Sequence, residues 1–93
     1  MTESLDVEVV LLQREDSTQF FRVLVRSKAK PTVRSYRDFE AAEMSERCAE
    51  IAGGALAEYQ CEQYGDRHDP SEYARTAARV YRDLMRQLNA PKH

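Results

Sequence analysis

The chain has 93 residues, of which 42% are hydrophobic and 32% charged, and it carries a formal net charge of −2. This length suits one domain, so we expect residues 1–93 to fold as a single small unit. The apolar content and the small net charge exclude the composition typical of a disordered chain. No apolar stretch approaches the roughly 18 residues of a membrane span. Residues 1–20 also lack the basic start and apolar stretch of a signal peptide.

The first two predicted elements are the strands of an antiparallel hairpin, over residues 5–13 and 19–28. Both segments alternate between apolar and polar side chains, and residues 14–18 between them are polar and turn-forming. We expect the register that places opposite charges across from each other and keeps the valines on one buried face. In that register the partners are Asp6 with Lys28, Glu8 with Arg26, Val9 with Val25 and Leu11 with Val23.

A short third strand is a further option at residues 32–36, after a turn at Pro31, because proline cannot donate a hydrogen bond to a sheet. If present, this strand would follow the hairpin directly. The N-terminal part of the chain is therefore predicted to be a small antiparallel sheet of two or three strands.

A long helix is predicted over residues 38–64. Asp38 is a good N-cap, and Gly65 is a typical residue to end a helix. Gly53 and Gly54 interrupt the helical pattern, so either the helix bends there or another backbone approaches closely. At about 100° per residue, one arc of this helix collects the residues expected to be buried. They are Ala41, Met44, Cys48, Ile51, Ala52, Ala55, Leu56 and Tyr59.

A second helix is predicted over residues 70–89, where Asp69 can cap the helix and Pro70 can take its first position. The linker before it is short, so we expect the two helices to form an antiparallel hairpin. Its apolar face consists of Tyr73, Ala77, Tyr81, Leu84, Met85 and Leu88. The sequence therefore predicts an α+β domain, in which an N-terminal antiparallel β-hairpin precedes a two-helix hairpin.

The chain shows no recognisable catalytic or metal-binding motif. On the first predicted helix, Cys48 and Cys61 would lie about 20 Å apart, too far for a disulfide or a shared metal ion. His68, next to Asp69 in the linker, is expected to help cap the turn. We therefore predict a protein that is not an enzyme, without cofactor or metal. Free thiols favour a reducing, cytoplasmic setting without membrane attachment.

Charge is segregated along the chain, because residues 38–72 are acidic whereas residues 14–37 and 73–93 are basic. These segments either screen each other on a solvated surface or form a polarised surface that orients a partner. The second helix carries four arginines on one side. This stripe suits either pairing with glutamates of the first helix or contact with the acids or phosphates of a partner. It consists of Arg75, Arg79, Arg82 and Arg86.

A second basic patch is expected on the outer face of the hairpin and the loop after it. The aromatic side chains of Phe20 and Tyr36 would add contact area to it. An uncovered sheet face and open sheet edges need a partner, and homodimerisation through the sheet would supply one. The basic residues of this patch are Arg22, Arg26, Lys28, Lys30, Arg34 and Arg37.

From Phe21 to Ala52, the chain has a strand, a basic turn, a short strand and the helix start Ser-Tyr-Arg-Asp-Phe-Glu-Ala-Ala-Glu. This order loosely resembles the arm-type DNA-binding modules of tyrosine recombinases. Those modules lay a three-stranded sheet against a helix and present the sheet to DNA. The resemblance covers about a third of the chain, which has no tryptophan and adds a second long helix. It implies DNA contact through the sheet.

Two functions are predicted from these features. The first is a small non-enzymatic protein-binding module, an inhibitor or adaptor of the kind that bacteria, phages and mobile elements encode, which masks a surface of its partner. The expected partner is another protein, with a nucleic-acid-binding complex as one option. Aromatic and arginine side chains would anchor that partner. The alternative is nucleic-acid binding, with the basic face of the hairpin on phosphate. The expected anchors for a protein partner are Phe20, Tyr36, Tyr81, Arg79 and Arg82.

Overall fold

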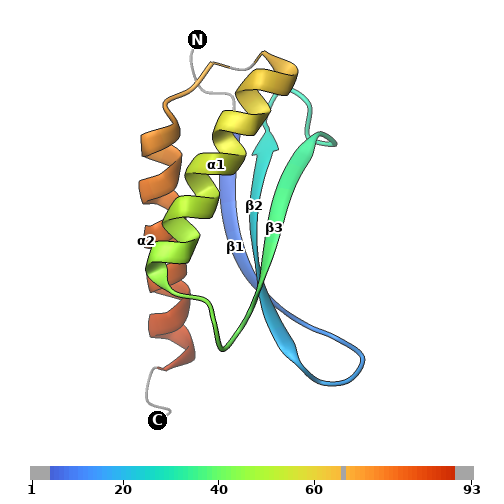
Figure 1. Cartoon of the computed structure of the whole chain (residues 1–93), viewed down its shortest axis with the longest axis vertical. Helices are drawn as coiled ribbons and strands as arrows, with labels where there is room; N and C mark the ends of the chain where they lie inside the picture. Colours follow the sequence, from blue (N-terminus) through green and yellow to red (C-terminus); the bar gives the residue numbers. More distant parts are fainter. Residues whose placement is uncertain (1–4, 66, 90–93) are drawn as a thin grey trace.

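The computed structural model describes residues 5–65 and 67–89, so the ends of the predicted domain at 1–4 and 90–93 lie outside the described residues. The strands form one antiparallel sheet in the order β1-β2-β3, and both helices pack on the same face of it (Figure 1). This arrangement confirms the predicted α+β fold, with the optional third strand present. The elements are β1 (Leu5–Gln13), β2 (Gln19–Ser27), β3 (Arg34–Glu40), α1 (Glu46–Tyr64) and α2 (Pro70–Leu88).

The β1–β2 hairpin has nearly the predicted strand ends, but the predicted register was wrong by two residues. Val9 faces Val23. The loop sets this register: the N–H of Arg14 donates to the carbonyl of Thr18 at 2.8 Å, and Ser17 has a left-handed φ of 73°. These are the features of a three-residue hairpin loop built on a type I turn. A shift of two residues leaves every side chain on its predicted face.

The two predicted charge pairs form in spite of the shift. Arg26 Nη2 lies 3.7 Å from Glu8 Oε1, and Lys28 Nζ lies 3.4 Å from Asp6 Oδ1. Each pair runs diagonally across the hairpin instead of directly. Diagonal neighbours on one sheet face are close enough for long side chains to meet. The charges are therefore compatible with either register, and the turn selects the observed one.

The third strand is longer than predicted and starts later, covering Arg34–Glu40 instead of 32–36. Asp38, the predicted helix N-cap, lies inside this strand opposite Arg22 of β2 and accepts two hydrogen bonds from its guanidinium. Phe39 packs against the core from the same strand. The predicted helix start was wrong because these contacts with β2 outweigh a local capping signal.

Helix α1 begins instead at Glu46, behind the N-cap Ser45. The hydroxyl of Ser45 accepts a hydrogen bond from the N–H of Cys48 at 3.2 Å. The helix ends where predicted, at Gly65, whose φ of 72° is the left-handed conformation that glycine adopts easily. The local signal at the end of the helix was therefore reliable, whereas the signal at its start was not.

The buried face of α1 is rotated away from the predicted arc. Ala52 is fully buried and Leu56 is half-buried, as expected, but Ile51, Ala55 and Tyr59 are exposed. The prediction followed the large apolar side chains, whereas the face that packs consists mainly of small ones. The buried residues of α1 are Ala49, Ala52, Gly53, Ala57 and Gln60.

The two adjacent glycines mark a close approach of α2 to α1, the second of the two predicted alternatives. A Cβ atom on Gly53 would lie 2.5 Å from the Cβ of Ala77 and 3.1 Å from the carbonyl oxygen of Tyr73. At Gly54 the nearest atom would be the Cβ of Ala74, at 3.2 Å. Gly53 therefore sits at the closest point of the helix pair, where no side chain fits.

Helix α2 begins and ends close to the predicted positions. Asp69 accepts a hydrogen bond from the N–H of Ser71 at 3.0 Å, and Pro70 occupies the first turn. The hydrogen bonds from Ser71 lower the pKa of the Asp69 carboxyl. Leu88 of the predicted apolar face is exposed. The buried members of that face are Tyr73, Ala77 and Tyr81.

The main core lies between the sheet and the two helices, and Tyr81 of α2 is at its centre. The ring of Tyr81 packs edge-to-face against Phe21 of β2, with centroids 5.4 Å apart. Its hydroxyl donates to the carbonyl of Met44, just before α1, at 3.0 Å. One side chain therefore joins the sheet, the second helix and the start of the first. This burial excludes Tyr81 as a surface anchor.

Candidate protein-binding groove

The outer face of the sheet is left uncovered by the helices of the described chain, since both pack against the opposite face (Figure 1). This is the face on which the sequence predicts a basic and aromatic patch. The apolar side chains on it are half-buried, apart from Tyr36, which is exposed. They are Val10, Leu12, Phe20, Leu24 and Tyr36.

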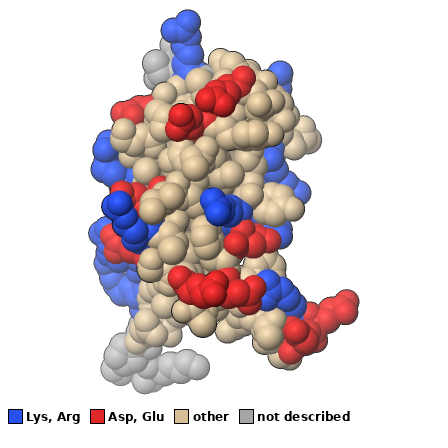
Figure 2. All heavy atoms as spheres, in the orientation of Figure 1, with Lys and Arg blue, Asp and Glu red and all other residues tan. Residues whose placement is uncertain are grey.

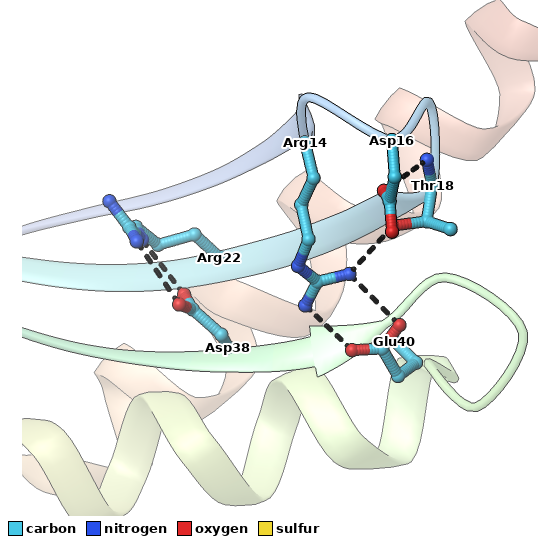
Figure 3. Close-up of polar contacts among 6 residues, drawn as sticks. All are labelled: Arg14, Asp16, Thr18, Arg22, Asp38 and Glu40. Atoms are coloured by element: carbon cyan, nitrogen blue, oxygen red, sulfur yellow. Dashed lines mark hydrogen bonds and ion pairs between the residues drawn. The ribbon is translucent and has the colours of Figure 1, made fainter.

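Carboxylates hold most of the basic side chains of this face, as Figure 3 shows for Arg14 and Arg22. Arg22 donates to both carboxylate oxygens of Asp38, at 2.8 and 3.0 Å. Arg14 donates to both carboxylate oxygens of Glu40, at 3.1 and 2.7 Å. These hydrogen bonds raise the pKa of both arginines. Together with the two diagonal pairs of the hairpin, ion pairs extend along the whole outer face.

The two aromatic rings of the outer face lie under arginine side chains. The guanidinium carbon of Arg14 is 4.4 Å from the ring centroid of Phe20, and that of Arg22 is 4.2 Å from the centroid of Tyr36. Such cation–π contacts are favourable by about 0.5–1 kcal/mol at exposed sites. Phe20 is half-buried as well as covered by Arg14, so it is a weaker candidate anchor for a partner than Tyr36, which is 54% exposed.

The arginine stripe of α2 lies beside the acidic start of α1, and Figure 2 shows blue and red side chains mixed along that side of the molecule. Arg82 donates to both carboxylate oxygens of Glu46, at 3.2 and 2.8 Å. Arg86 pairs with Asp83 of its own helix at 3.3 Å. For Arg82, the structure shows the predicted pairing with a glutamate of the first helix. A hollow of about 330 Å³ in this region is lined by Glu46, Glu50, Arg75, Ala78, Arg79 and Arg82.

The pairing between the helices has a signature that NMR can measure. The hydrogen bond from Arg82 lowers the pKa of the Glu46 carboxyl below its ordinary 4.5. A lowered pKa stabilises the fold above pH 4.5, and this contribution is lost as the pH falls through the lowered value. We expect Arg82→Gln to return the pKa of Glu46 toward 4.5 in a carboxyl-carbon titration. Arg79→Gln, which removes a neighbouring arginine, is the control, and an unchanged Glu46 in Arg82→Gln would contradict the pairing.

A groove lies between β3 and α1, at the edge of the sheet opposite β1. It has a volume of about 360 Å³, and each of its three tyrosines keeps about half of its surface exposed. Large, exposed aromatic side chains gathered on one surface are typical of a protein-binding site. The residues that line the groove are Arg34, Ser35, Tyr36, Leu56, Tyr59 and Tyr64.

The open edge of β3 adjoins this groove. The carbonyl of Val33 accepts from the N–H of Ser27, and the N–H of Ala41 donates to the carbonyl of Gln19, so odd-numbered residues at both ends of β3 bond to β2. In an antiparallel pair these residues alternate with others whose N–H and C=O groups point the other way. Among the described strands, none pairs with β3 on that side. The outward-directed residues are Arg34, Tyr36, Asp38 and Glu40.

Gln60 joins α1 to the strands beneath the groove. Its side chain is fully buried, and its Nε2 donates to Ser35 Oγ at 3.2 Å and to the carbonyl of Val25 at 3.5 Å. A buried amide needs such partners, so the helix is fixed to β2 and β3 at this point. Tyr59 and Tyr64, on either side of Gln60 in the sequence, then line the groove from the helix.

Only part of this groove was found from the sequence. Arg34 and Tyr36 are predicted as binding residues and do line it. Tyr59 is predicted as a core residue, and Tyr64 is not singled out. The one sequence signal for the tyrosines is the Gly53-Gly54 pair, because a helix that packs through its small residues leaves its large ones elsewhere. The other predicted patch residues, apart from Arg34 and Tyr36, do not line the groove.

The described residues contain neither a group of metal ligands nor a helix that could span a membrane. No three His, Cys, Asp or Glu side chains of residues 5–65 and 67–89 are grouped as metal ligands. Over the same ranges, no helix combines the length and the apolar character needed to cross a membrane. Cys48 and Cys61 are free thiols on α1. His68 packs edge-to-face against Tyr73, with centroids 5.5 Å apart, and its ring nitrogens have no hydrogen-bond partner among the described residues, so the predicted capping role was wrong.

Comparison with protein-family models, curated proteins and solved structures finds no match to this chain. The stretch that resembles the arm-type modules of tyrosine recombinases does not form the expected helix start, because residues 35–43 belong to β3 and the turn after it. That resemblance therefore assigns no function.

Proposed function

We propose that this protein is a non-enzymatic protein-binding module, an adaptor or inhibitor that covers an extended segment of its partner. The observation that carries the proposal is the continuity of the tyrosine groove with the open edge of β3. An extended segment can add to such an edge as a further strand. Backbone hydrogen bonds then supply affinity, and a neighbouring pocket for alternate side chains supplies specificity.

The edge and the groove coincide at two residues. Arg34 and Tyr36 both direct their backbone groups outward and both line the groove with their side chains. A strand added beside them would point successive side chains to opposite faces. Every second side chain would then meet Leu56, Tyr59 or Tyr64 on α1. One segment can therefore use the edge and the groove together.

Tyrosine is well suited to hold such a segment. Its ring offers a large apolar area, its hydroxyl bonds to polar groups, and it has few rotatable bonds to immobilise. Tyrosines in a well-packed interface are often among the few residues that carry most of the binding energy. We expect Tyr59 to be such a residue, since it lines the groove and is exposed in the free protein.

The outer face gives less support to nucleic-acid binding. Arg22 and Arg26, both predicted to contact phosphate, already pair with carboxylates across the strands. A phosphate would have to replace these partners, and the protein's net charge of −2 adds no attraction. The two free cysteines support a reducing, cytoplasmic location for the proposed binding.

Selection from random linear peptides displayed on phage tests the proposal. The wild-type protein is the target, and the Tyr59→Ser variant is used for counter-selection. We expect the selected peptides to bind the wild type at least about tenfold more tightly than Tyr59→Ser, because interface tyrosines are common hot spots. Fluorescence polarisation with labelled peptides gives the Kd values.

Ile51→Ser is the matched control. Ile51 lies on the same helix and is 55% exposed, against 48% for Tyr59, but it does not line the groove. Its variant should bind the peptides as the wild type does. The proposal fails if no peptide prefers the wild type over Tyr59→Ser, or if both variants lose affinity equally. Tight, salt-sensitive binding of labelled DNA or RNA without any selected peptide would favour the nucleic-acid function instead.

A further inference from the structure

Three cations at the β3 side of the sheet have no carboxylate partner among residues 5–65 and 67–89. They contrast with the outer face, where the basic side chains of β2 are paired. Basic side chains reach the surface on the β3 side of the molecule in Figure 2. A negatively charged partner would meet these cations without breaking an existing pair. They are Lys30, Arg34 and Arg37, all exposed.

Arg34 and Arg37 lie on opposite faces of β3, because side chains alternate along a strand. Arg34 is on the outer face with Tyr36 and lines the groove. Arg37 is on the face that α1 covers, and its guanidinium carbon is 5.5 Å from the ring centroid of Phe39. A strand added at the open edge would therefore have one unpaired arginine toward each of its faces.

We infer that the occupant of this edge is an acidic extended segment of another protein. Its carboxylates pair with Arg34 and Arg37, and its apolar or aromatic side chains enter the tyrosine groove. An arginine can donate to both oxygens of one carboxylate, which fixes direction as well as charge. Lys30, in the turn before β3, adds to the attraction during encounter. This inference rests on the proposed function and names the chemistry of its partner.

Exposed acids elsewhere on α1 limit how much negative charge the occupant carries. Glu58 and Glu62 are exposed on α1, the helix that supplies Tyr59 and Tyr64. They would repel a nucleic-acid strand, because it carries a negative charge on every nucleotide. A segment with a few carboxylates near β3 and uncharged side chains near α1 avoids that repulsion.

A second copy of this chain fits less well than a different protein. The acidic strand of the chain is β1, and its Asp6 and Glu8 pair with Lys28 and Arg26 of the same molecule. To reach Arg34 of another copy, they would have to give up these pairs. An acidic segment of another protein can bind without breaking these ion pairs.

The peptides selected on the wild-type protein provide the probe. We expect them to be richer in Asp and Glu than the starting library, with an apolar or aromatic residue at alternate positions. The tightest peptide is then compared with a copy in which its Asp and Glu are replaced by Asn and Gln. The double variant Arg34→Gln/Arg37→Gln should bind the acidic peptide about tenfold less tightly, a loss that declines at high salt as charge pairs are screened.

Arg75→Gln/Arg79→Gln is the matched control, since it removes the same charge from exposed positions on α2 that do not line the groove. It should bind both peptides as the wild type does. Amide exchange adds a structural readout: the outward N–H groups of Tyr36 and Asp38 should become protected when the acidic peptide binds.

The failure of this inference can be told apart from the failure of the proposed function. Peptides that depend on Tyr59 but contain no excess of acids, and that bind the Arg34→Gln/Arg37→Gln variant normally, would overturn the acidic partner and leave the binding module standing. The absence of any peptide that depends on Tyr59 would overturn both. Self-association in sedimentation that the double arginine variant abolishes would overturn the separate partner in favour of a second copy.

Discussion

Replacing Gly53 by alanine is expected to destabilise the fold by about 2 kcal/mol, although alanine is the better helix former by about 1 kcal/mol. The added Cβ would lie 2.5 Å from the Cβ of Ala77 and 3.1 Å from the carbonyl oxygen of Tyr73. Neither neighbour is the flexible end of a long side chain. The two helices must therefore move apart, and the packing between them is lost along their length. Urea unfolding followed by circular dichroism measures the change.

Gly54→Ala is the matched control, because it makes the same substitution one residue further along the helix. Its new Cβ would lie 3.2 Å from the Cβ of Ala74 and 3.6 Å from the nearest backbone oxygen. A shift of a few tenths of an ångström relieves that contact. The helix propensity of alanine then leaves stability unchanged or raises it by up to about 1 kcal/mol. Equal stabilities of the two variants would contradict the close approach at Gly53.

The parts of the fold that were predicted correctly depend on local chemistry. The strand ends of the hairpin follow from alternation along the chain and a polar turn. The end of α1 at Gly65 and the start of α2 after Asp69 follow from capping residues that act within a few positions. Each of these signals needs no knowledge of the rest of the fold.

The errors arose where a distant contact outweighed a local signal. Asp38 has the chemistry of an N-cap, but the gain from pairing with Arg22 and from burying Phe39 keeps it in a strand. The register of the hairpin depends on Ser17 adopting a left-handed conformation, which is uncommon for a residue other than glycine. Nothing in the alternation of the strands signals that choice.

Only some of the groove residues could be predicted from the sequence, for the same reason. Arg34 and Tyr36 could be identified because they belong to a sheet face expected to be exposed. Tyr59 was assigned to the core because large apolar residues usually lie there. If Gly53 is taken as the centre of the packed face, then at about 100° per residue Ile51 and Tyr59 lie about 160° and 120° around the helix from it. The contact between Gly53 and α2 determines which face of α1 packs, and both residues are therefore exposed.

Replacing Tyr81 by alanine is expected to have the largest effect on stability, a loss of about 3–5 kcal/mol. The substitution removes a buried ring that packs against Phe21 and leaves a cavity between the sheet and α2. It also leaves the carbonyl of Met44 without the hydroxyl that bonds to it at 3.0 Å. Small domains are stable by about 5–15 kcal/mol in total, so the variant should unfold at much lower urea concentration. A loss below about 1 kcal/mol would contradict the central position of this ring.

Tyr81→Phe separates the hydrogen bond of Tyr81 from the packing of its ring. It keeps the contact with Phe21 and should cost only about 1 kcal/mol, the usual net value of one hydrogen bond. Burial raises the pKa of the Tyr81 hydroxyl above its ordinary 10.0. The unfolded chain therefore loses this proton at a lower pH than the folded protein. The free energy of unfolding of the wild type then decreases as the pH rises from 10 toward the raised pKa of Tyr81. Tyr81→Phe has no such proton, so the stability gap between the two proteins should shrink over that range. A constant gap would mean that the hydroxyl of Tyr81 is as accessible in the fold as in the unfolded chain, and that α2 is not fastened to the start of α1 through it.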